Sequence, residues 1–135
     1  MSNKVNPSLY PALVLAYIGD AVYEVFTREK LLLQNPDMPA HKLHRENVHL
    51  VRAKAQSNSM AAIEPLLTES ELAVYKRGRN AKAGSVPKNA DLIDYRRATG
   101  FEALVGYLHL SGNTDRLNEI MEIAYKNAQV TTQEE

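Results

Sequence analysis

The sequence predicts an all-α protein with one domain, and three observations favour that class. Apolar residues recur at intervals of three and four positions along nearly the whole chain, as they do on the buried face of a helix. No internal repeat and no long alternating, strand-like run interrupts this pattern. The 135 residues, 44% hydrophobic and 24% charged, match one globular domain. We therefore expect a single domain over 1–135, with a core from about 8 to 128 and a disordered tail over 129–135.

The first two predicted helices occupy the N-terminal half of the chain. Ser8 is a good N-cap residue, and Pro11 then lies in the first turn, where a missing amide is harmless. This helix extends to about Leu33, where a Gln-Asn-Pro-Asp turn ends it. A second helix is predicted from about 40 to 63, with apolar residues on one face.

Three further helices are predicted in the C-terminal half. Thr68-Glu-Ser-Glu71 matches a capping box and starts the third helix, which ends in a basic segment punctuated by glycine. The fourth helix runs from about 89 to 110 and is closed by Ser-Gly-Asn. The fifth runs from about 114 to 128.

The composition excludes several classes of protein. The chain has no cysteine, which excludes disulfide scaffolds, cysteine-ligated zinc, iron–sulfur clusters and thiol nucleophiles. The first residues do not have the pattern of an export signal. The longest uncharged stretch, Val5–Gly19, contains two prolines and is shorter than the ~20 apolar residues of a membrane span. We therefore expect a cytoplasmic protein that does not enter a membrane.

Asp20 is the first candidate site residue, because it is an acid in an otherwise apolar helix. Glu24 follows four positions later, so the two carboxylates share one helix face. Gly19 costs about 1 kcal/mol in a helix interior relative to alanine, which indicates the close approach of another backbone or of a ligand. Two interpretations stay open. Asp20 either pairs with a buried arginine or caps a neighbouring helix, or it lies in a dry wall and binds a hard cation such as Mg²⁺.

Glu102 has a similar setting, since it is a lone acid in an apolar helix and follows closely after a glycine. If the two helices pack face to face, Asp20 and Glu102 come together. Like charges in a low dielectric repel strongly unless one is protonated or a cation lies between them. A metal site and two-metal phosphodiester cleavage form one hypothesis, and the residues alone leave a structural role open as well.

The net charge of zero hides an uneven distribution of sixteen basic and sixteen acidic residues. Residues 76–97 carry seven basic residues against two acids, whereas the chain beyond Gly112 carries five acids against two basic residues. A basic loop that contains glycine presents guanidinium groups and backbone amides to phosphates. The alternative is a solvated charged loop, which is what most such runs are.

Three histidines, His41, His44 and His49, lie with Lys42 and Arg45 at the start of the second predicted helix. His41 and His44 share a helix face, but no acid completes a known zinc pattern. An exposed or phosphate-facing cluster is therefore the favoured interpretation.

Two motifs, Tyr17-Ile-Gly-Asp-Ala-Val-Tyr-Glu24 and Thr99-Gly-Phe-Glu-Ala-Leu-Val-Gly-Tyr-Leu108, resemble the catalytic domain of ribonuclease III. The similarity is closest to the short bacterial branch of that family, the Mini-III ribonucleases. The similarity covers residues from about 13 to 110, and its motifs follow one another in the same order as in the family. Shorter supporting segments are His41–His44, Ala53–Gln56, Arg77–Lys82, Pro87–Asn89 and Tyr95–Arg96.

This resemblance implies an all-helical endonuclease that acts as a homodimer and cleaves double-stranded RNA with Mg²⁺, leaving 5′-phosphate and 3′-hydroxyl ends. Asp20 and Glu102 match the acids that bind the catalytic metal, and Glu24 matches an acid that we place just outside the metal's own ligands. The short branch lacks the separate double-stranded-RNA-binding domain, so the basic segment would contact RNA through Lys76, Arg77, Arg79, Asn80, Lys82 and Lys88.

The branch is associated with maturation of the large-subunit (23S) ribosomal RNA precursor, which implies ribosomal RNA as substrate and a ribosomal protein as a further partner. Two positions depart from the full-length family pattern, since Ala16 and Thr99 stand where acids are expected. Their absence keeps a second hypothesis open, a non-catalytic helical module for RNA binding or ribosome assembly. A helical protein-interaction domain is a more distant alternative.

Overall fold

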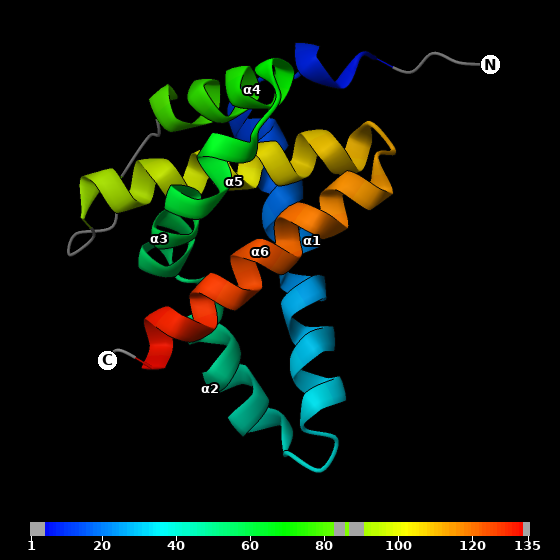
Figure 1. Cartoon of the computed structure of the whole chain (residues 1–135), viewed down its shortest axis with the longest axis vertical. Helices are drawn as coiled ribbons and strands as arrows, with labels where there is room; N and C mark the ends of the chain where they lie inside the picture. Colours follow the sequence, from blue (N-terminus) through cyan, green and yellow to red (C-terminus); the bar gives the residue numbers. More distant parts are fainter. Residues whose placement is uncertain (1–4, 83–85, 87–90, 134–135) are drawn as a thin grey trace.

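The computed structural model describes residues 5–82, 86 and 91–133, and within these ranges the fold is all-α, as predicted (Figure 1). Two short 3-10 helices, Pro7–Leu9 and Glu64–Leu66, accompany six α-helices. The α-helices are α1 (Ala12–Gln34), α2 (Ala40–Val51), α3 (Ala53–Ile63), α4 (Glu69–Asn80), α5 (Leu92–Leu110) and α6 (Thr114–Gln133). No described helix has an apolar stretch long enough to cross a bilayer.

The crossing of α1 over α5 is at the centre of the molecule (Figure 1). The main core gathers around Phe101 and Leu104 of α5. It takes buried residues from the neighbouring helices α1, α3, α4 and α6, among them Tyr23, Met60, Tyr75 and Ile120. The second half of α1 and helix α2 extend from this body as an arm, which a turn closes at its tip (Figure 1). The two halves of the chain thus meet where the sequence places its two lone acids.

The single helix predicted over 40–63 is wrong, because the chain breaks at Arg52 into α2 and α3. Arg52 has an extended backbone, with φ −65° and ψ 158°. The break leaves the Val51 carbonyl without its helical donor, and the side-chain amide of Gln56 donates to it at 2.9 Å. Apolar periodicity continues through this corner, so the sequence pattern did not show it.

The ends of three helices test the capping predictions. The capping box is confirmed, since Thr68 Oγ1 accepts from the Glu71 amide at 3.2 Å and Glu71 Oε1 accepts from the Thr68 amide at 2.9 Å. Ser8 is not the N-cap of α1: it lies in the first 3-10 helix, and α1 begins after Pro11 without a side-chain cap. The fourth predicted helix begins at Leu92, where Asp91 caps it.

The predicted disordered tail over 129–135 is also wrong for its first part. Helix α6 continues to Gln133, and Thr131 is buried against α3. The hydroxyl of Thr131 donates to the Asn127 carbonyl at 3.1 Å and accepts from the Asn58 amide at 3.3 Å. A polar composition indicated disorder, whereas a partner helix orders these residues.

Candidate active site

The backbones of α1 and α5 touch at two glycines, and this contact brings Asp20 and Glu102 together. A Cβ on Gly19 would lie 1.8 Å from the Glu102 carbonyl oxygen, and one on Gly106 would lie 2.0 Å from the Leu15 carbonyl oxygen. Only glycine permits so close an approach. Asp20 and Glu102, one from each helix, lie within hydrogen-bonding reach of one another. The predicted juxtaposition of the two acids is therefore present.

The two carboxylates differ in their surroundings. Glu102 is half-buried, and desolvation, followed by the negative charge of Asp20, raises its pKa to about 8. Asp20 is exposed, so the expectation of a carboxylate in a dry wall is wrong for Asp20. The pair thus has one solvent-facing acid and one acid that holds a proton near neutral pH in the absence of a cation.

Gln56 is a member of the site that sequence reasoning did not assign. This residue is buried on α3, and its Nε2 atom contacts Glu102 Oε2 at 3.4 Å in addition to the Val51 carbonyl. The corner at Arg52 turns α3 towards α5 and so places this amide. A polar residue on the apolar face of a predicted helix was the available signal.

Glu24 lies one turn beyond Asp20, and its negative charge also raises the pKa of Glu102. Its Oε1 atom accepts two hydrogen bonds, from Asn47 Nδ2 at 2.7 Å and from Arg28 Nε at 3.0 Å. Asn47 was not a sequence candidate either, because it comes from α2 and only the folded arm brings it to Glu24.

The donor set fits a hard cation. Two adjacent carboxylates repel, and Mg²⁺ prefers one or two carboxylates together with water and phosphate oxygens. Asp20 and Glu102 supply this pair. Within the described ranges no three histidine, aspartate or glutamate side chains approach closely enough to form a complete metal cage.

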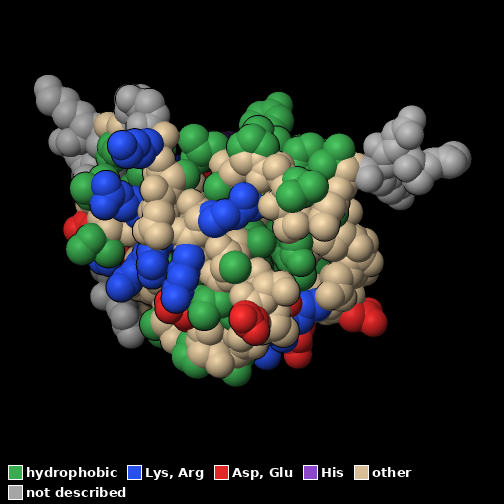
Figure 2. Space-filling view, turned by 90° about the horizontal axis from the view of Figure 1, so that it is seen from above, with side chains coloured by type: hydrophobic (Ala, Val, Ile, Leu, Met, Phe, Trp, Pro, Cys, Tyr) green, Lys and Arg blue, Asp and Glu red, His purple; other side chains and the backbone are tan. Residues whose placement is uncertain are grey.

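The basic segment adjoins this site through α5. Gly78 of α4 is buried against α5, where a Cβ on Gly78 would lie 2.8 Å from Ala103 Cβ, and Ala103 is next to Glu102 in the chain. Lysines and arginines gather on one side of the face seen from above, over the end of α4 and the start of α5 (Figure 2). The basic segment therefore begins on α4, the helix that packs directly against the part of α5 that carries Glu102.

The individual basic residues differ in their contacts. Lys76, Arg77, Asn80 and Lys82 are exposed, although Arg77 also donates to the Tyr10 carbonyl at 3.3 Å. Arg79 is half-buried, with its guanidinium carbon 5.6 Å from the centroid of the Tyr75 ring. Lys88 lies outside the described residues.

Comparison with known proteins decides the family. A model described as "Ribonuclease III domain" matches residues 13–113. A Mini-ribonuclease 3 of Brevibacillus brevis is 50% identical over 120 residues, covering 89% of each chain. A second, from Clostridium tetani, is 46% identical over 123 residues, covering 91% of this chain and 82% of the relative. This chain belongs to the ribonuclease III family, in its Mini-ribonuclease branch.

The fold agrees with that membership. A crystal structure of a protein from Fusobacterium nucleatum superposes with a TM-score of 0.78 at 29% identity, covering 87% of this chain and 93% of the other. As a member of the ribonuclease III family, the chain is an endoribonuclease.

Two positions in this ribonuclease III domain lack the acids of the full-length pattern, and the structure shows what stands there. Ala16 is buried in the wall between α1 and its neighbours. Thr99 donates its hydroxyl to the Tyr95 carbonyl at 3.0 Å, one turn back in its own helix. Neither residue adds a charge to the Asp20–Glu102 pair.

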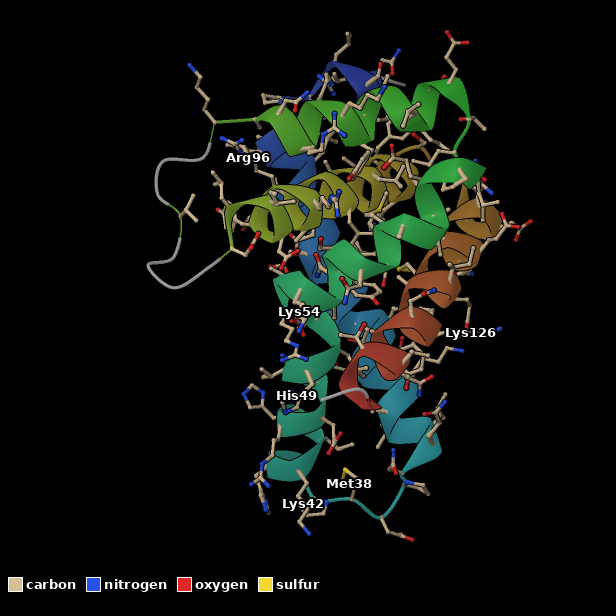
Figure 3. All side chains as sticks on the ribbon, turned by 60° about the vertical axis from the view of Figure 1, so that its left-hand side comes forward. Met38, Lys42, His49, Lys54, Arg96 and Lys126 are labelled. Atoms are coloured by element: carbon tan, nitrogen blue, oxygen red, sulfur yellow. The ribbon has the colours of Figure 1, made fainter. Side chains whose placement is uncertain are left out.

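The histidines of α2 are not part of the carboxylate site. His41 and His44 are exposed and His49 is half-buried. Figure 3 shows His49 on the same side of α2 and α3 as Lys42 and Lys54. Lys126 lies on the opposite side of the molecule.

Proposed function

We propose that the chain cleaves double-stranded RNA in a reaction that depends on Mg²⁺, with Asp20 and Glu102 as the metal ligands and catalytic residues. The observation that carries this proposal is the pairing of these two acids across the glycine contact of α1 and α5. A bare pair of this kind is electrostatically unfavourable, so a cation is the natural complement. Family membership supplies the reaction class.

Each side chain of the site has a distinct task. Asp20 and Glu102 hold Mg²⁺, which when bound activates a water and stabilises charge on the phosphate and the leaving oxygen. Gln56 orients the Glu102 carboxylate through its amide. The products are 5′-phosphate and 3′-hydroxyl ends.

The exposed cations at the end of α4 bind the phosphates of the duplex. Lys76, Arg77 and Lys82 are exposed, and the half-buried Arg79 lies near them with its guanidinium carbon 5.6 Å from the centroid of the Tyr75 ring. Asn80, which is also exposed, belongs to this proposed contact surface, and Lys88 is added to it from the sequence alone. Recognition through phosphates and duplex shape implies a broad sequence preference and an affinity that falls with salt.

An exposed apolar face on α1 supports a homodimer. Val14, Tyr17 and Val25 share one side of the helix, and Tyr17 is 77% exposed. Tyr17→Asp places a charge in this interface and should convert the dimer to monomer in sedimentation equilibrium. A wild-type protein that sediments as a monomer would contradict this part of the proposal.

The substrate that the branch suggests is the 23S ribosomal RNA precursor in the cytoplasm, presented by a ribosomal protein. Purified enzyme should cut the precursor faster when ribosomal proteins are bound to it than when it is naked. Equal rates on both substrates would remove the protein partner from the proposal.

The decisive experiment is incubation of purified protein with an RNA duplex, with and without Mg²⁺. We expect cleavage only with Mg²⁺, and loss of cleavage in Asp20→Asn. Asp37→Asn is a matched control, because Asp37 is an exposed acid in the turn at the far end of α1. RNA that is bound but never cut would favour the non-catalytic module, which the missing acids at positions 16 and 99 support.

A further inference from the structure

A chain of hydrogen bonds connects α2 to the acid beside the catalytic pair. Thr27 Oγ1 donates to Asn47 Oδ1 at 2.6 Å, and Asn47 Nδ2 donates to Glu24 Oε1 at 2.7 Å. Thr27 is completely buried and Asn47 is 3% exposed. The Thr27–Asn47 bond is therefore made away from competing water, and the Asn47–Glu24 bond is partly buried.

The orientation of the Asn47 amide is fixed by its two neighbours. An ionised carboxylate only accepts hydrogen bonds, so the NH₂ group must face Glu24 and the carbonyl oxygen must face Thr27. The Thr27 hydroxyl then serves as the donor that holds this orientation.

Asn47 is the stronger of the two anchors on Glu24. The other donor to Oε1, Arg28, has a side chain that is 62% exposed, and exposed ion pairs are weak. Both donors use the same oxygen, and Oε2 accepts no hydrogen bond from the described part of the chain. Glu24 is thus fixed through one oxygen, while the other is available to the site.

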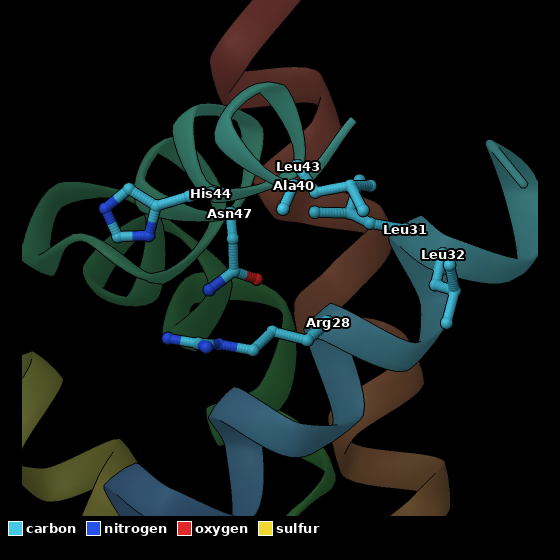
Figure 4. A pocket seen from close by; sticks show the side chains of 7 residues that line it. All are labelled: Arg28, Leu31, Leu32, Ala40, Leu43, His44 and Asn47. Atoms are coloured by element: carbon cyan, nitrogen blue, oxygen red, sulfur yellow. The ribbon is translucent and has the colours of Figure 1, made fainter. Parts of the chain in front are cut away.

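A cavity next to Asn47 shows why the Thr27 anchor matters. This cavity of about 250 Å³ lies between α1 and α2, and the Asn47 amide projects into it beside Arg28 and His44 (Figure 4). Its other lining residues are mostly apolar. Without the Thr27 hydroxyl, the amide has room to rotate away from Glu24.

We propose that Asn47, held by Thr27, is a positioning residue that fixes the Glu24 carboxylate beside Asp20 and Glu102 and thereby sets the affinity of the site for Mg²⁺. This inference rests on the proposed function, because it assumes that Asp20 and Glu102 bind the metal. Asn47 acts only through Glu24, since it is buried and contacts neither metal ligand.

The test measures Mg²⁺ binding by calorimetry, without RNA, in Asn47→Ala and Thr27→Val. Loss of a residue that orients a metal site costs ten- to a hundredfold in affinity, and we expect a reduction of about tenfold in both variants. Thr27→Val keeps the shape of the side chain and measures the effect if Asn47→Ala folds poorly. Melting curves in EDTA verify the fold.

Thr131→Val is the matched control. Thr131 is also a buried threonine whose hydroxyl pairs with an asparagine of a neighbouring helix, Asn58, but among the residues that the structure describes this asparagine donates to no acid. This variant should bind Mg²⁺ like the wild type. Affinities of the Asn47 and Thr27 variants within twofold of the control would overturn the proposal.

A double variant shows whether the effect passes through Glu24. If it does, Asn47→Ala combined with Glu24→Gln binds Mg²⁺ no more weakly than Glu24→Gln alone. If the two substitutions reduce the affinity for Mg²⁺ additively, Asn47 does not act by positioning Glu24. In cleavage assays kcat should fall while KM for the duplex stays constant, because Asn47 is not on the surface. If the wild type cuts no duplex although the Mg²⁺ affinities shift as expected, the proposed function fails and the positioning of Glu24 stands.

Discussion

Glu71 is a buried acid and Glu102 a half-buried acid of the same helical body, yet their surroundings shift their pKa values in opposite directions. Hydrogen bonds from Arg116 lower the pKa of Glu71, whereas burial and the adjacent Asp20 raise the pKa of Glu102 to about 8. Glu71 is satisfied by Arg116 and by the Thr68 amide. Glu102 has one long contact from Gln56 and a neighbour of like charge.

Glu71 is therefore an acid that stabilises the folded state, whereas Glu102 is an acid that destabilises it. A buried carboxylate that has a cation and a capping role makes the folded state more stable. One that faces another carboxylate makes it less stable, and such strain concentrates at functional sites. The predictions below test this contrast in order of expected effect.

The largest effect is expected on catalysis. Glu102→Gln removes the charge that holds Mg²⁺ and should lower the cleavage rate about a thousandfold, because metal assistance is worth several kcal/mol and each 1.4 kcal/mol is tenfold. Single-turnover cleavage of an RNA duplex measures it. Glu71→Gln should retain most of the activity. A fully active Glu102→Gln would exclude Glu102 as a catalytic residue.

The second-largest effect is expected on stability, when Glu71 loses its partner Arg116. Arg116→Met leaves a buried carboxylate without its cation and should reduce the free energy of unfolding by about 3 kcal/mol. Urea denaturation measures this. Arg28→Met is the control: the Arg28 side chain is 62% exposed against 20% for Arg116, so its ion pair contributes less than about 1 kcal/mol. Equal losses of unfolding free energy in Arg116→Met and Arg28→Met would contradict the stabilising role given to Glu71 and Arg116.

The two acids also predict opposite dependences of stability on pH. The lowered pKa of Glu71 gives stability that is present above the unfolded value near 4.5 and is lost as the pH falls through the folded pKa. The raised pKa of Glu102 means that the folded state binds more protons between about 4.5 and 8, so stability declines as the pH rises through that window.

In EDTA, Glu102→Gln should therefore become more stable than the wild type as the pH rises from 4.5 to 8, by several kcal/mol at the upper end. Thermal melts at several pH values measure the difference. A stability difference that does not change with pH would show that Glu102 titrates normally.

The smallest effect concerns the cap that Glu71 completes. Thr68→Ala removes one half of the capping box and should cost about 1 kcal/mol, with no change in cleavage rate. Ser70→Ala, at the second residue of the same helix, serves as the control, because Ser70 is exposed and is not the N-cap. A loss of activity in Thr68→Ala would connect the start of α4 to the site.

Much of this architecture follows from local sequence signals. Helix class, the capping box at Thr68 and the pairing of Asp20 with Glu102 follow from periodicity, cap residues and glycines beside lone acids. The periodicity and the cap act over one or two helical turns, whereas the pairing of the two acids needed the further assumption that their helices pack face to face.

The features that the sequence did not predict depend on contacts between distant segments. The corner at Arg52 continues the apolar pattern without a break, and α6 is ordered beyond Ala128 because Thr131 meets Asn58. Asn47 and Gln56 join the site only through the packing of α2 and α3 on α1 and α5. The assignment of Asp20, Glu24 and Glu102 to metal binding stays a prediction.

The glycine contact between α1 and α5 has a mechanical consequence. Because backbone meets backbone at Gly19 and Gly106, no side chain lies between the helices to yield or repack there. Rocking of α1 on α5 therefore pivots at this contact, and displacement grows with distance from it. Asp20 and Glu102, beside the pivot, move least, while the arm of α1 and α2 sweeps through the largest arc (Figure 1). Any rocking of α1 on α5 would therefore move the arm while the spacing of the two acids stays constant.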